Sequence, residues 1–251
     1  MLNFHNLAPQ NYNFRGISTY KIRFLIMIYT LIETADGSKT IFIPEMNEQY
    51  HSVNGAITES EYVFVNNGFT FRQKKDPVIF EAGFGTGLNA LLTAINAEKN
   101  NRLTTYYAIE KYPLAGEIIK TLAYGDIISN EAINIYEKIH SCEWGKTVQI
   151  SPCFYIHKIN ADLIEFSVNS IPMFDIIYFD AFGPDKQPEI WTSEIFQKIY
   201  TNCSPGAVFV TYSAKGEIRR QLANVGFEIE RLSGPPGKKH MLRGIKKISS
   251  N

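Results

Sequence analysis

The chain has 251 residues, of which 45% are hydrophobic and 20% charged, a composition that suits one α/β domain with a small appendage. Its 25 basic and 25 acidic side chains give a formal net charge of zero, which excludes a long-range attraction of the whole protein to nucleic acid. A nucleic acid could then be bound only by a local basic patch. The longest apolar stretch, residues 22–32, is too short to cross a membrane. Three widely spaced cysteines and five histidines without metal-ligand spacing predict neither a disulfide framework nor a metal site, and we expect a cytoplasmic protein.

The first 76 residues differ from the rest of the chain. Residues 1–26 are rich in asparagine and lack a clear periodicity, so we expect a disordered or mis-called extension that precedes a natural start at Met27. In residues 27–76, short apolar runs alternate with turn residues, including Asp36-Gly37 and Asn67-Gly68. This pattern predicts a small β-rich N-terminal extension in which Asn67-Gly68 turns a hairpin.

From Pro77 onward, apolar runs alternate with helix-forming segments. Strands are expected at 77–83, 104–110, 153–159, 174–180 and 206–212, with helices over 86–97, from 114, over 189–200 and over 216–224. Such alternation indicates a parallel sheet with both faces covered. The last two runs, 226–232 and 240–247, have no helix between them and predict a closing antiparallel hairpin. Residues 77–251 are therefore expected to form a Rossmann-like α/β domain, whose mostly parallel sheet fits the seven-stranded methyltransferase type better than the six-stranded dehydrogenase type.

The segment FEAGFGTGLNA, residues 80–90, joins the first of these strands to a helix through three glycines. Gly83, Gly85 and Gly87 can adopt positive φ and let the backbone approach a ligand at the start of the helix. The spacing differs from the G-x-G-x-x-G of dinucleotide sites, and Glu81 before the glycines repels a pyrophosphate but suits an ammonium group, such as that of S-adenosylmethionine. A glycine-rich turn that binds nothing remains the alternative.

Two further acids follow strands whose carboxyl ends should lie beside this turn. Glu110 stands 23 residues after Gly87, near the offset of about 20 residues at which an acid reaches ribose hydroxyls in this topology. Its alternative role is to start the helix that follows. Asp162 can accept a hydrogen bond from an adenine amino group or cap the turn at Leu163, and both roles stay open.

Asp180 ends an apolar strand and opens the loop of YFDAFGPDKQPEIW, which cannot continue a strand and suits the lining of a cleft. A carboxylate in that place can orient an attacking amine and stabilise the positive charge that forms when nitrogen takes up a methyl group. A loop-bracing or helix-capping role is the alternative. The sequence contains no G-x-S-x-G, so a serine nucleophile is not indicated.

The strings FEAGFGTGLNALLTA, AIEKYPL, YFDAFGPDKQPEIWT and the segment 211–244 together resemble the MnmC/MnmD methyltransferase family. The resemblance spans about residues 48–244 and is to the stand-alone form, without the flavin oxidase domain to which some members are fused. It implies that Gly83, Gly85, Gly87 and Glu110 hold S-adenosyl-L-methionine, and that Asp180, Phe182 and Pro184 border the reacting methyl group. It also implies a substrate-side segment around Tyr50, Ser52 and Glu59.

The family's activity is the methylation of 5-aminomethyl(-2-thio)uridine at the tRNA wobble position, so the resemblance implies a tRNA anticodon loop as the partner. A functional link to a separate enzyme that generates the aminomethyl precursor is implied as well. Residues 215–251 carry nine Lys or Arg against three acids, and Lys238 and Lys239 in the loop SGPPGKKH are expected to track phosphates. Aromatic side chains near strand ends (Phe84, Phe182, Trp191 and Tyr212) can stack on the base, although core packing is the simpler role for any one of them.

Two other functions stay open on the sequence. An aminopropyltransferase related to spermidine synthase would share the sheet and could place Asp185 and Glu189 around a polyamine. A non-catalytic RNA-binding protein would need only the basic tail, and the complete glycine turn with Glu110 argues against it.

Overall fold

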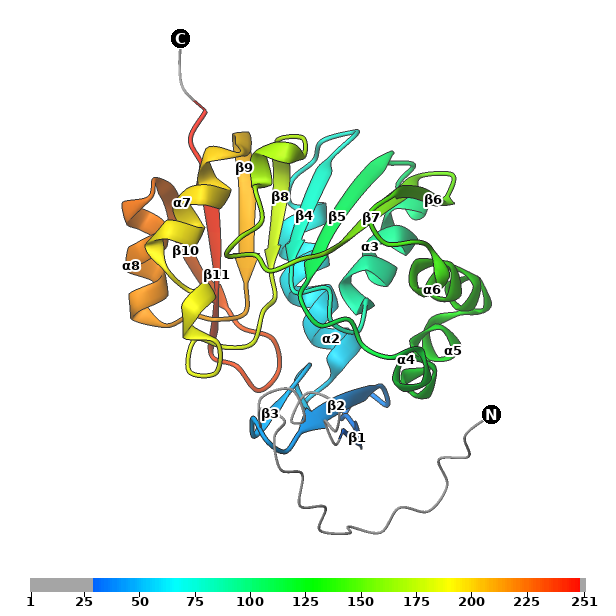
Figure 1. Ribbon diagram of the computed structural model, residues 1–251. Helices are drawn as coiled ribbons and strands as arrows, with labels where there is room; N and C mark the ends of the chain where they lie inside the picture. Colours follow the sequence, from blue (N-terminus) through cyan, green and yellow to red (C-terminus); the bar gives the residue numbers. More distant parts are fainter. Residues whose placement is uncertain (1–28, 249–251) are drawn as a thin grey trace, which may run out of the picture.

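The computed structural model describes residues 29–248, which form two β-sheets with helices packed around the larger one (Figure 1). The smaller sheet has three antiparallel strands, β1 (Thr30–Glu33), β2 (Lys39–Ile43) and β3 (Glu48–Gln49). Asp36 and Gly37 form the predicted turn between β1 and β2, where Gly37 has a φ of 80° and Asp36 Oδ1 accepts a hydrogen bond from Ser38 N. The expectations for residues 1–26 and for a start at Met27 lie outside the described residues.

The larger sheet confirms the predicted fold class and adds one strand at its edge. Its order within the described residues is β10-β11-β9-β8-β4-β5-β7-β6. The strands are β4 (Val78–Ala82), β5 (Thr104–Glu110), β6 (Thr147–Ser151), β7 (Phe154–Asn160), β8 (Phe174–Phe179), β9 (Cys203–Thr211), β10 (Phe227–Ser233) and β11 (His240–Lys246). Strands β4, β5, β7, β8 and β9 run parallel, whereas β10 and β11 form the predicted antiparallel hairpin. The sequence analysis did not foresee β6, which pairs antiparallel with β7.

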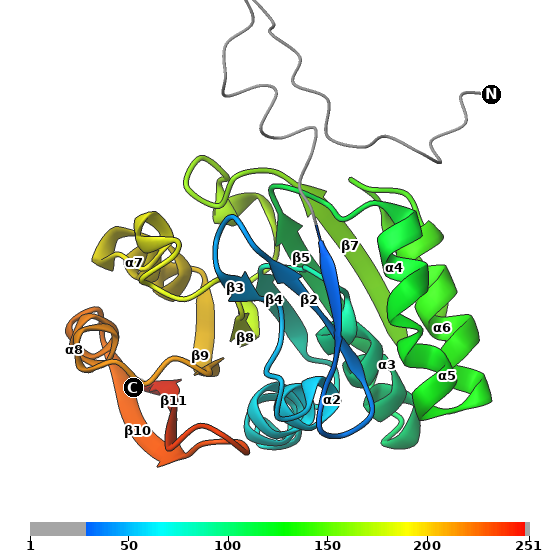
Figure 2. The ribbon, with the colours of Figure 1, turned by 90° about the horizontal axis from the view of Figure 1, so that it is seen from below.

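Helices cover both faces of this sheet. They are α2 (Ala56–Ser60), the π-helix η1 (Glu61–Thr70), α3 (Leu88–Lys99), α4 (Gly116–Leu122), α5 (Tyr124–Ile128), α6 (Asn130–Ser141), α7 (Ser193–Thr201) and α8 (Gly216–Asn224), with short 3₁₀ turns η2 (Val168–Ser170) and η3 (Pro188–Ile190). Successive strand residues enter opposite cores: Ile79, Tyr106 and Ile176 pack with η1, α3 and α6, whereas Phe80, Tyr107 and Ile177 belong to the core that α7 and α8 cover. Figure 2 shows the two helix groups on opposite sides of the sheet. Burial on both faces explains why the two central strands, β4 and β8, are almost continuously apolar.

The hairpin predicted at Asn67-Gly68 is wrong, because these residues lie inside η1. Gly68 is buried against the sheet, and a Cβ added there would lie 2.9 Å from Tyr178 Cε1 and 3.1 Å from Val210 Cγ2. Asn67 donates a hydrogen bond to the Tyr62 carbonyl five residues earlier, at 2.8 Å. The glycine therefore permits close packing of a helix on the sheet. Within the predicted extension, the described residues 29–76 combine a small sheet with two helices.

The order of the strands reverses around β4, since the chain runs from β4 to β5 and β7 on one side and returns through β8 and β9 on the other. Ligands of doubly wound sheets bind beyond the carboxyl ends of the strands at such a switch point. The three-stranded sheet lies across these ends (Figures 1 and 2). No helix within residues 29–248 combines the length and hydropathy needed to cross a membrane. The domain boundary at residues 76 and 77 stays a prediction.

Candidate functional site

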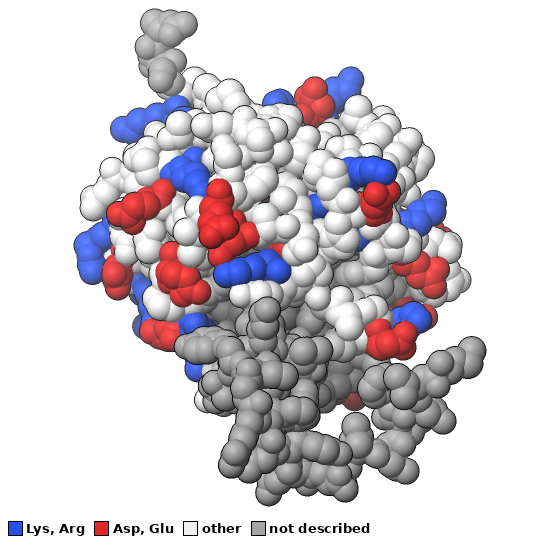
Figure 3. Space-filling view, in the orientation of Figure 1, with Lys and Arg blue, Asp and Glu red and all other residues white. Residues whose placement is uncertain are grey.

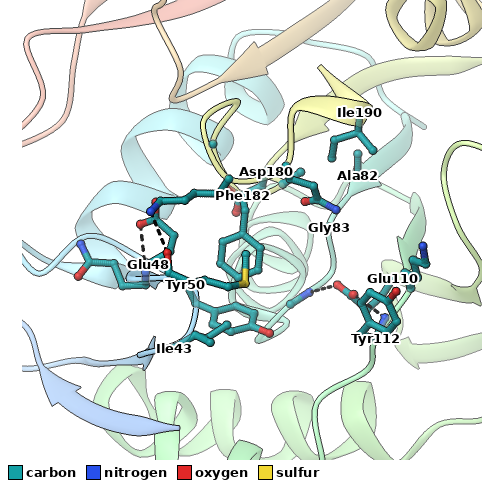
Figure 4. A pocket seen from close by; sticks show the side chains of 18 of the residues that line it. Ile43, Glu48, Tyr50, Ala82, Gly83, Glu110, Tyr112, Asp180, Phe182 and Ile190 are labelled. Atoms are coloured by element: carbon teal, nitrogen blue, oxygen red, sulfur yellow. Dashed lines mark hydrogen bonds between the residues drawn. The ribbon is translucent and has the colours of Figure 1, made fainter. Parts of the chain in front are cut away.

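A pocket of 490 Å³ opens at the carboxyl ends of β4, β5 and β8. Ala82 and Gly83 contribute the β4 side, Glu110 the β5 side and Asp180 the β8 side, so that in Figure 4 Gly83 lies between the two acids. Residues of β2, β3 and the segment after them close the pocket from the other direction. Its volume lies within the range of roughly 300–1,000 Å³ that is usual for small-molecule sites.

The glycine turn forms the floor of the pocket through two of its three predicted glycines. Gly83 has a φ of 92°, and a Cβ there would lie 2.8 Å from the Asp180 carbonyl oxygen. Gly85 has a φ of 50°, and its missing Cβ leaves the space beside the Tyr50 ring. Gly87 instead begins α3 with a φ of 72° and packs against His140, away from the residues that line the pocket. Gly83 and Gly85 thus leave backbone exposed to a ligand, whereas Gly87 serves the start of the helix.

Glu110, at the end of β5, is tied to the glycine turn. Its Oε2 accepts a hydrogen bond from Gly85 N at 3.0 Å, and its Oε1 accepts one from Tyr112 N at 2.9 Å. The second bond closes a local turn after β5 and does not start a helix, since α4 begins at Gly116 with Ala115 as its N-cap and no side-chain cap. The first bond orients the carboxylate along the pocket, which it lines. A carboxylate has about four acceptor positions, so these two bonds leave capacity for ligand hydroxyls.

Asp162 also lines the pocket, and its turn-capping role is realised. Its Oδ1 accepts a hydrogen bond from Ile164 N at 2.9 Å, and its Oδ2 pairs with Lys111 Nζ at 2.6 Å. Although burial opposes ionisation, these hydrogen bonds lower the pKa of Asp162 below its ordinary value of 3.8. The side chain is therefore a fixed carboxylate at the edge of the pocket.

Asp180 and Glu81 are joined by Asn89, a residue that the sequence analysis missed. The Asn89 amide donates to Glu81 Oε1 at 2.9 Å and to Asp180 Oδ2 at 2.7 Å. Asp180 lines the pocket, but Glu81 is fully buried beneath α3 and is absent from the pocket lining. The alternation of side chains along β4 puts Glu81 on the face of Ile79, toward α3, which is why it lies behind the pocket.

Burial raises the pKa of both carboxyls well above their ordinary values, and the charge of Glu59 raises that of Asp180 further. Asp180 is consequently a stronger base than an exposed aspartate. The Asn89 amide, which does not line the pocket, fixes the orientation of the Asp180 carboxyl through Oδ2.

The loop after β8 is anchored at several points around Asp180. Trp191 Nε1 donates to the Phe182 carbonyl at 2.7 Å, and Tyr212 Oη donates to the Ala181 carbonyl at 2.8 Å. Lys186 Nζ reaches the Met46 carbonyl at 2.8 Å, which links the loop to the three-stranded sheet. Trp191, like Phe84, is a buried core residue, whereas Phe182 and Tyr212 line the pocket.

The substrate-side segment lies opposite this loop. The Tyr50 ring meets the Phe182 ring edge-on, with centroids 5.0 Å apart, and both rings line the pocket together with Ser52. His51 lines it as well, and burial lowers its pKa to about 4, so the ring is neutral at pH 7. Lys238 lines the pocket, but Pro184 and Lys239 are absent from its lining.

The basic side chains of residues 215–251 are partly matched by nearby acids. Within the described residues, four of the nine cations form ion pairs: Lys215 with Asp185, Lys238 with Glu59, Arg243 with Glu230 and Lys247 with Glu228. Lys246 binds the carbonyls of Tyr200 and Cys203. On the face seen in Figure 3, cationic and anionic side chains are interspersed. A nucleic acid would therefore meet scattered cations on this face instead of one strongly positive field.

Comparisons with known proteins match parts of the chain to methyltransferases. Residues 133–247 match a family described as S-adenosyl-L-methionine-dependent methyltransferase. The tRNA 5-methylaminomethyl-2-thiouridine biosynthesis bifunctional protein MnmC of Burkholderia multivorans is 30% identical over 232 residues, which cover 86% of this chain and 34% of that protein. The MnmC of Idiomarina loihiensis is 30% identical over 213 residues, covering 78% and 35%. The chain thus spans about a third of the length of the curated relatives it matches.

Two solved structures share the fold over most of the chain. MnmC2 from Aquifex aeolicus has a TM-score of 0.67 at 24% identity and covers 92% of this chain and 78% of its own. A spermidine synthase in complex with the transition-state analogue AdoDATO has a TM-score of 0.55 at 14% identity and covers 89% and 70%. The resemblance found in the sequence is confirmed: the chain has the Rossmann-like fold and carries the S-adenosyl-L-methionine-dependent methyltransferase region that it shares with the MnmC proteins.

Proposed function

We propose that this protein transfers a methyl group from S-adenosyl-L-methionine to the amine nitrogen of 5-aminomethyl(-2-thio)uridine at the wobble position of tRNA. The observation that carries the proposal is the pocket at the switch point, where Glu110 and Asp180 flank the exposed backbone of Gly83. Similarity to the MnmC proteins supports the choice of acceptor.

The residues of the pocket fit the cofactor. Gly83 and Gly85 line the pocket and carry no side chain, so their backbone can approach the methionine part of the cofactor. A Cβ at either position would press on Asp180 or Tyr50, which line the same pocket. The Glu110 carboxylate is oriented to accept hydrogen bonds from ribose hydroxyls, and Asp162 lies at the pocket edge where an adenine amino group can donate to it. Glu81 supports the site from behind through Asn89, and its buried carboxyl does not face the ligand.

For methyl transfer to the amine, the protein needs to position the two reactants and to supply one proton acceptor. Bound S-adenosyl-L-methionine supplies an electrophilic methyl group on a sulfonium. The amine must be neutral to attack, because its nitrogen lone pair forms the new N–C bond while the C–S electron pair leaves with sulfur. An alkylamine has a pKa near 10 and is mostly protonated at pH 7. Asp180, held by Asn89 with a raised pKa, orients the amine and accepts its proton.

The walls of the pocket suit a base that has been turned out of an anticodon loop. Tyr50 and Phe182 present aromatic surface for the uracil ring, and the loop that contains Pro184 shapes the entrance. Lys238 and Lys239 lie in the loop between β10 and β11, from which they can meet tRNA phosphates. A separate reaction that builds or uncovers a primary amine on C5 of the uridine must supply the substrate.

The aminopropyltransferase alternative is less well supported. Of the two acids that would surround a polyamine, Glu189 lines the pocket, but Asp185 pairs with Lys215 and is absent from its lining. The likeness to spermidine synthase is one of fold.

Incubation of the purified protein with methyl-labelled S-adenosyl-L-methionine tests the proposal. Label should enter tRNA that carries 5-aminomethyluridine and should be absent from the same tRNA with an unmodified wobble uridine. A parallel reaction with putrescine and decarboxylated cofactor should give no spermidine. Label in both tRNAs, or spermidine formation without tRNA methylation, would overturn the proposal.

A further inference from the structure

An ion pair inside the pocket joins two distant parts of the chain. Glu59, on α2, is almost buried, and its Oε1 lies 2.6 Å from Nζ of Lys238 in the loop between β10 and β11. Its Oε2 accepts a hydrogen bond from Ser52 N at 2.9 Å. The carboxylate is therefore fixed by backbone on one side and presents its other oxygen to a cation.

The ring of Tyr212 lies on another side of the Lys238 ammonium. Lys238 Nζ lies 3.8 Å from the centroid of the Tyr212 ring, a distance at which the ring attracts an ammonium group. The hydroxyl of Tyr212 is bonded to the Ala181 carbonyl, the residue after Asp180. Glu59, Tyr212, Lys238 and Asp180 all line the pocket, and the charges of Glu59 and Lys238 both act on Asp180.

Glu59 and Tyr212 are held more firmly in the structure than Lys238. Glu59 sits on a helix, and the Tyr212 side chain is tethered at the end of β9, whereas Lys238 reaches the site on a flexible four-carbon stem from a loop. A fixed carboxylate beside an aromatic face is the chemistry that recognises an ammonium ion, whatever molecule carries it.

We propose that Glu59 and Tyr212 form the subsite for the protonated aminomethyl group of the acceptor, and that the ammonium of Lys238 occupies this subsite until the acceptor displaces it. The inference rests on the proposed function. The exchange replaces one cation by another, so the buried Glu59 never loses its counter-charge, which would be costly. A uridine without the amine cannot displace Lys238, so the ammonium of Lys238 stays in the subsite. The displacement of Lys238 therefore favours binding of the aminomethyl base over the unmodified one.

The test compares affinities for two tRNAs, one with 5-aminomethyluridine and one unmodified, without cofactor. The preference is the ratio of the two dissociation constants. Lys238→Met removes the competing cation and should raise the preference for the aminomethyl tRNA severalfold. Glu59→Gln should lower it by about tenfold, the contribution of one charge-assisted hydrogen bond. Lys146→Met, which removes an exposed ion pair with Glu143 outside the pocket, should leave the ratio unchanged.

The inference is overturned if Lys238→Met weakens binding of both tRNAs by the same factor, because Lys238 would then contact phosphates only. An unchanged ratio in a folded Glu59→Gln protein would overturn it as well. Methyl transfer by the wild-type protein is measured alongside. If the wild type methylates aminomethyl tRNA and the ratios do not move, only the cation subsite fails; if it methylates neither tRNA, the proposed function fails.

Discussion

Substitution of Gly83 by alanine should damage both stability and catalysis, because two separate penalties meet at this position. The backbone there has a φ of 92°, a conformation that costs an L-residue about 1–3 kcal/mol. The added Cβ would also lie 2.8 Å from the Asp180 carbonyl oxygen and 3.2 Å from Ala181 Cα, both backbone atoms that cannot rotate away. Relief to an ordinary C···O distance of about 3.3 Å moves the Asp180 loop by about 0.5 Å.

Two other glycines separate these penalties. Gly37 has a similar φ of 80° with nothing within 4 Å of an added Cβ, so Gly37→Ala measures the conformational cost alone. Gly116 has an ordinary φ and open space at the start of α4, so Gly116→Ala should be neutral or stabilising by up to about 1 kcal/mol.

Urea unfolding of the three variants should give the order Gly83→Ala, Gly37→Ala, Gly116→Ala from least to most stable. Only Gly83→Ala should lower kcat for methyl transfer, by about tenfold or more, since displacement of a catalytic group by a fraction of an ångström is felt in the rate. A Gly83→Ala protein with the stability of Gly37→Ala and a normal kcat would refute the reasoning.

Three further predictions concern the acids and their support. Asp180→Asn should reduce kcat by about 100-fold or more. It should also stabilise the protein. The pKa of Asp180 is raised in the folded state, so between pH 3.8 and that raised pKa the native state binds more protons than the unfolded state. The stability of the wild type therefore falls as the pH rises between these two values. Urea unfolding should therefore show a difference in unfolding free energy between variant and wild type that is larger at pH 8 than at pH 5. A difference that does not change between these pH values would contradict the raised pKa. Glu110→Gln should weaken S-adenosyl-L-methionine binding by about tenfold in calorimetry, whereas Glu117→Gln on the exposed side of α4 should not; equal affinities would remove Glu110 from the cofactor site. Asn89→Ala should lower kcat while cofactor affinity stays within about threefold, and a loss of cofactor binding instead would mean that Asn89 acts on the cofactor and does not position Asp180.

Much of the fold followed from local patterns in the sequence. The helix predicted over 216–224 coincides with α8, and the loop SGPPGKK joins the two strands predicted to form a hairpin. These elements have strong periodicity and clear turn residues between them. Strand β6 was not predicted, because an edge strand with a solvent-exposed face carries polar residues and shows little apolar pattern.

The errors arose where tertiary packing decides the role of a residue. Asn67-Gly68 has the composition of a hairpin turn, but Gly68 is needed for the contact of η1 with Tyr178 and Val210, residues far along the chain. The position of Glu81 depends on which face of β4 lies under α3, which the sequence does not state. Asn89 joins two carboxyls, and Glu59 meets Lys238, only because the fold brings the carboxyl ends of the strands together with α2 and the last hairpin.

The central claim is that this protein methylates the amine of the wobble uridine, and nucleoside mass spectrometry of cellular tRNA tests it most directly. tRNA from the native host lacking this gene should accumulate 5-aminomethyluridine species and lose the 5-methylaminomethyl species. A plasmid-borne wild-type gene should restore them, whereas one that encodes Asp180→Asn should not. Unchanged amounts of the 5-methylaminomethyl species in the deletion strain would contradict the claim.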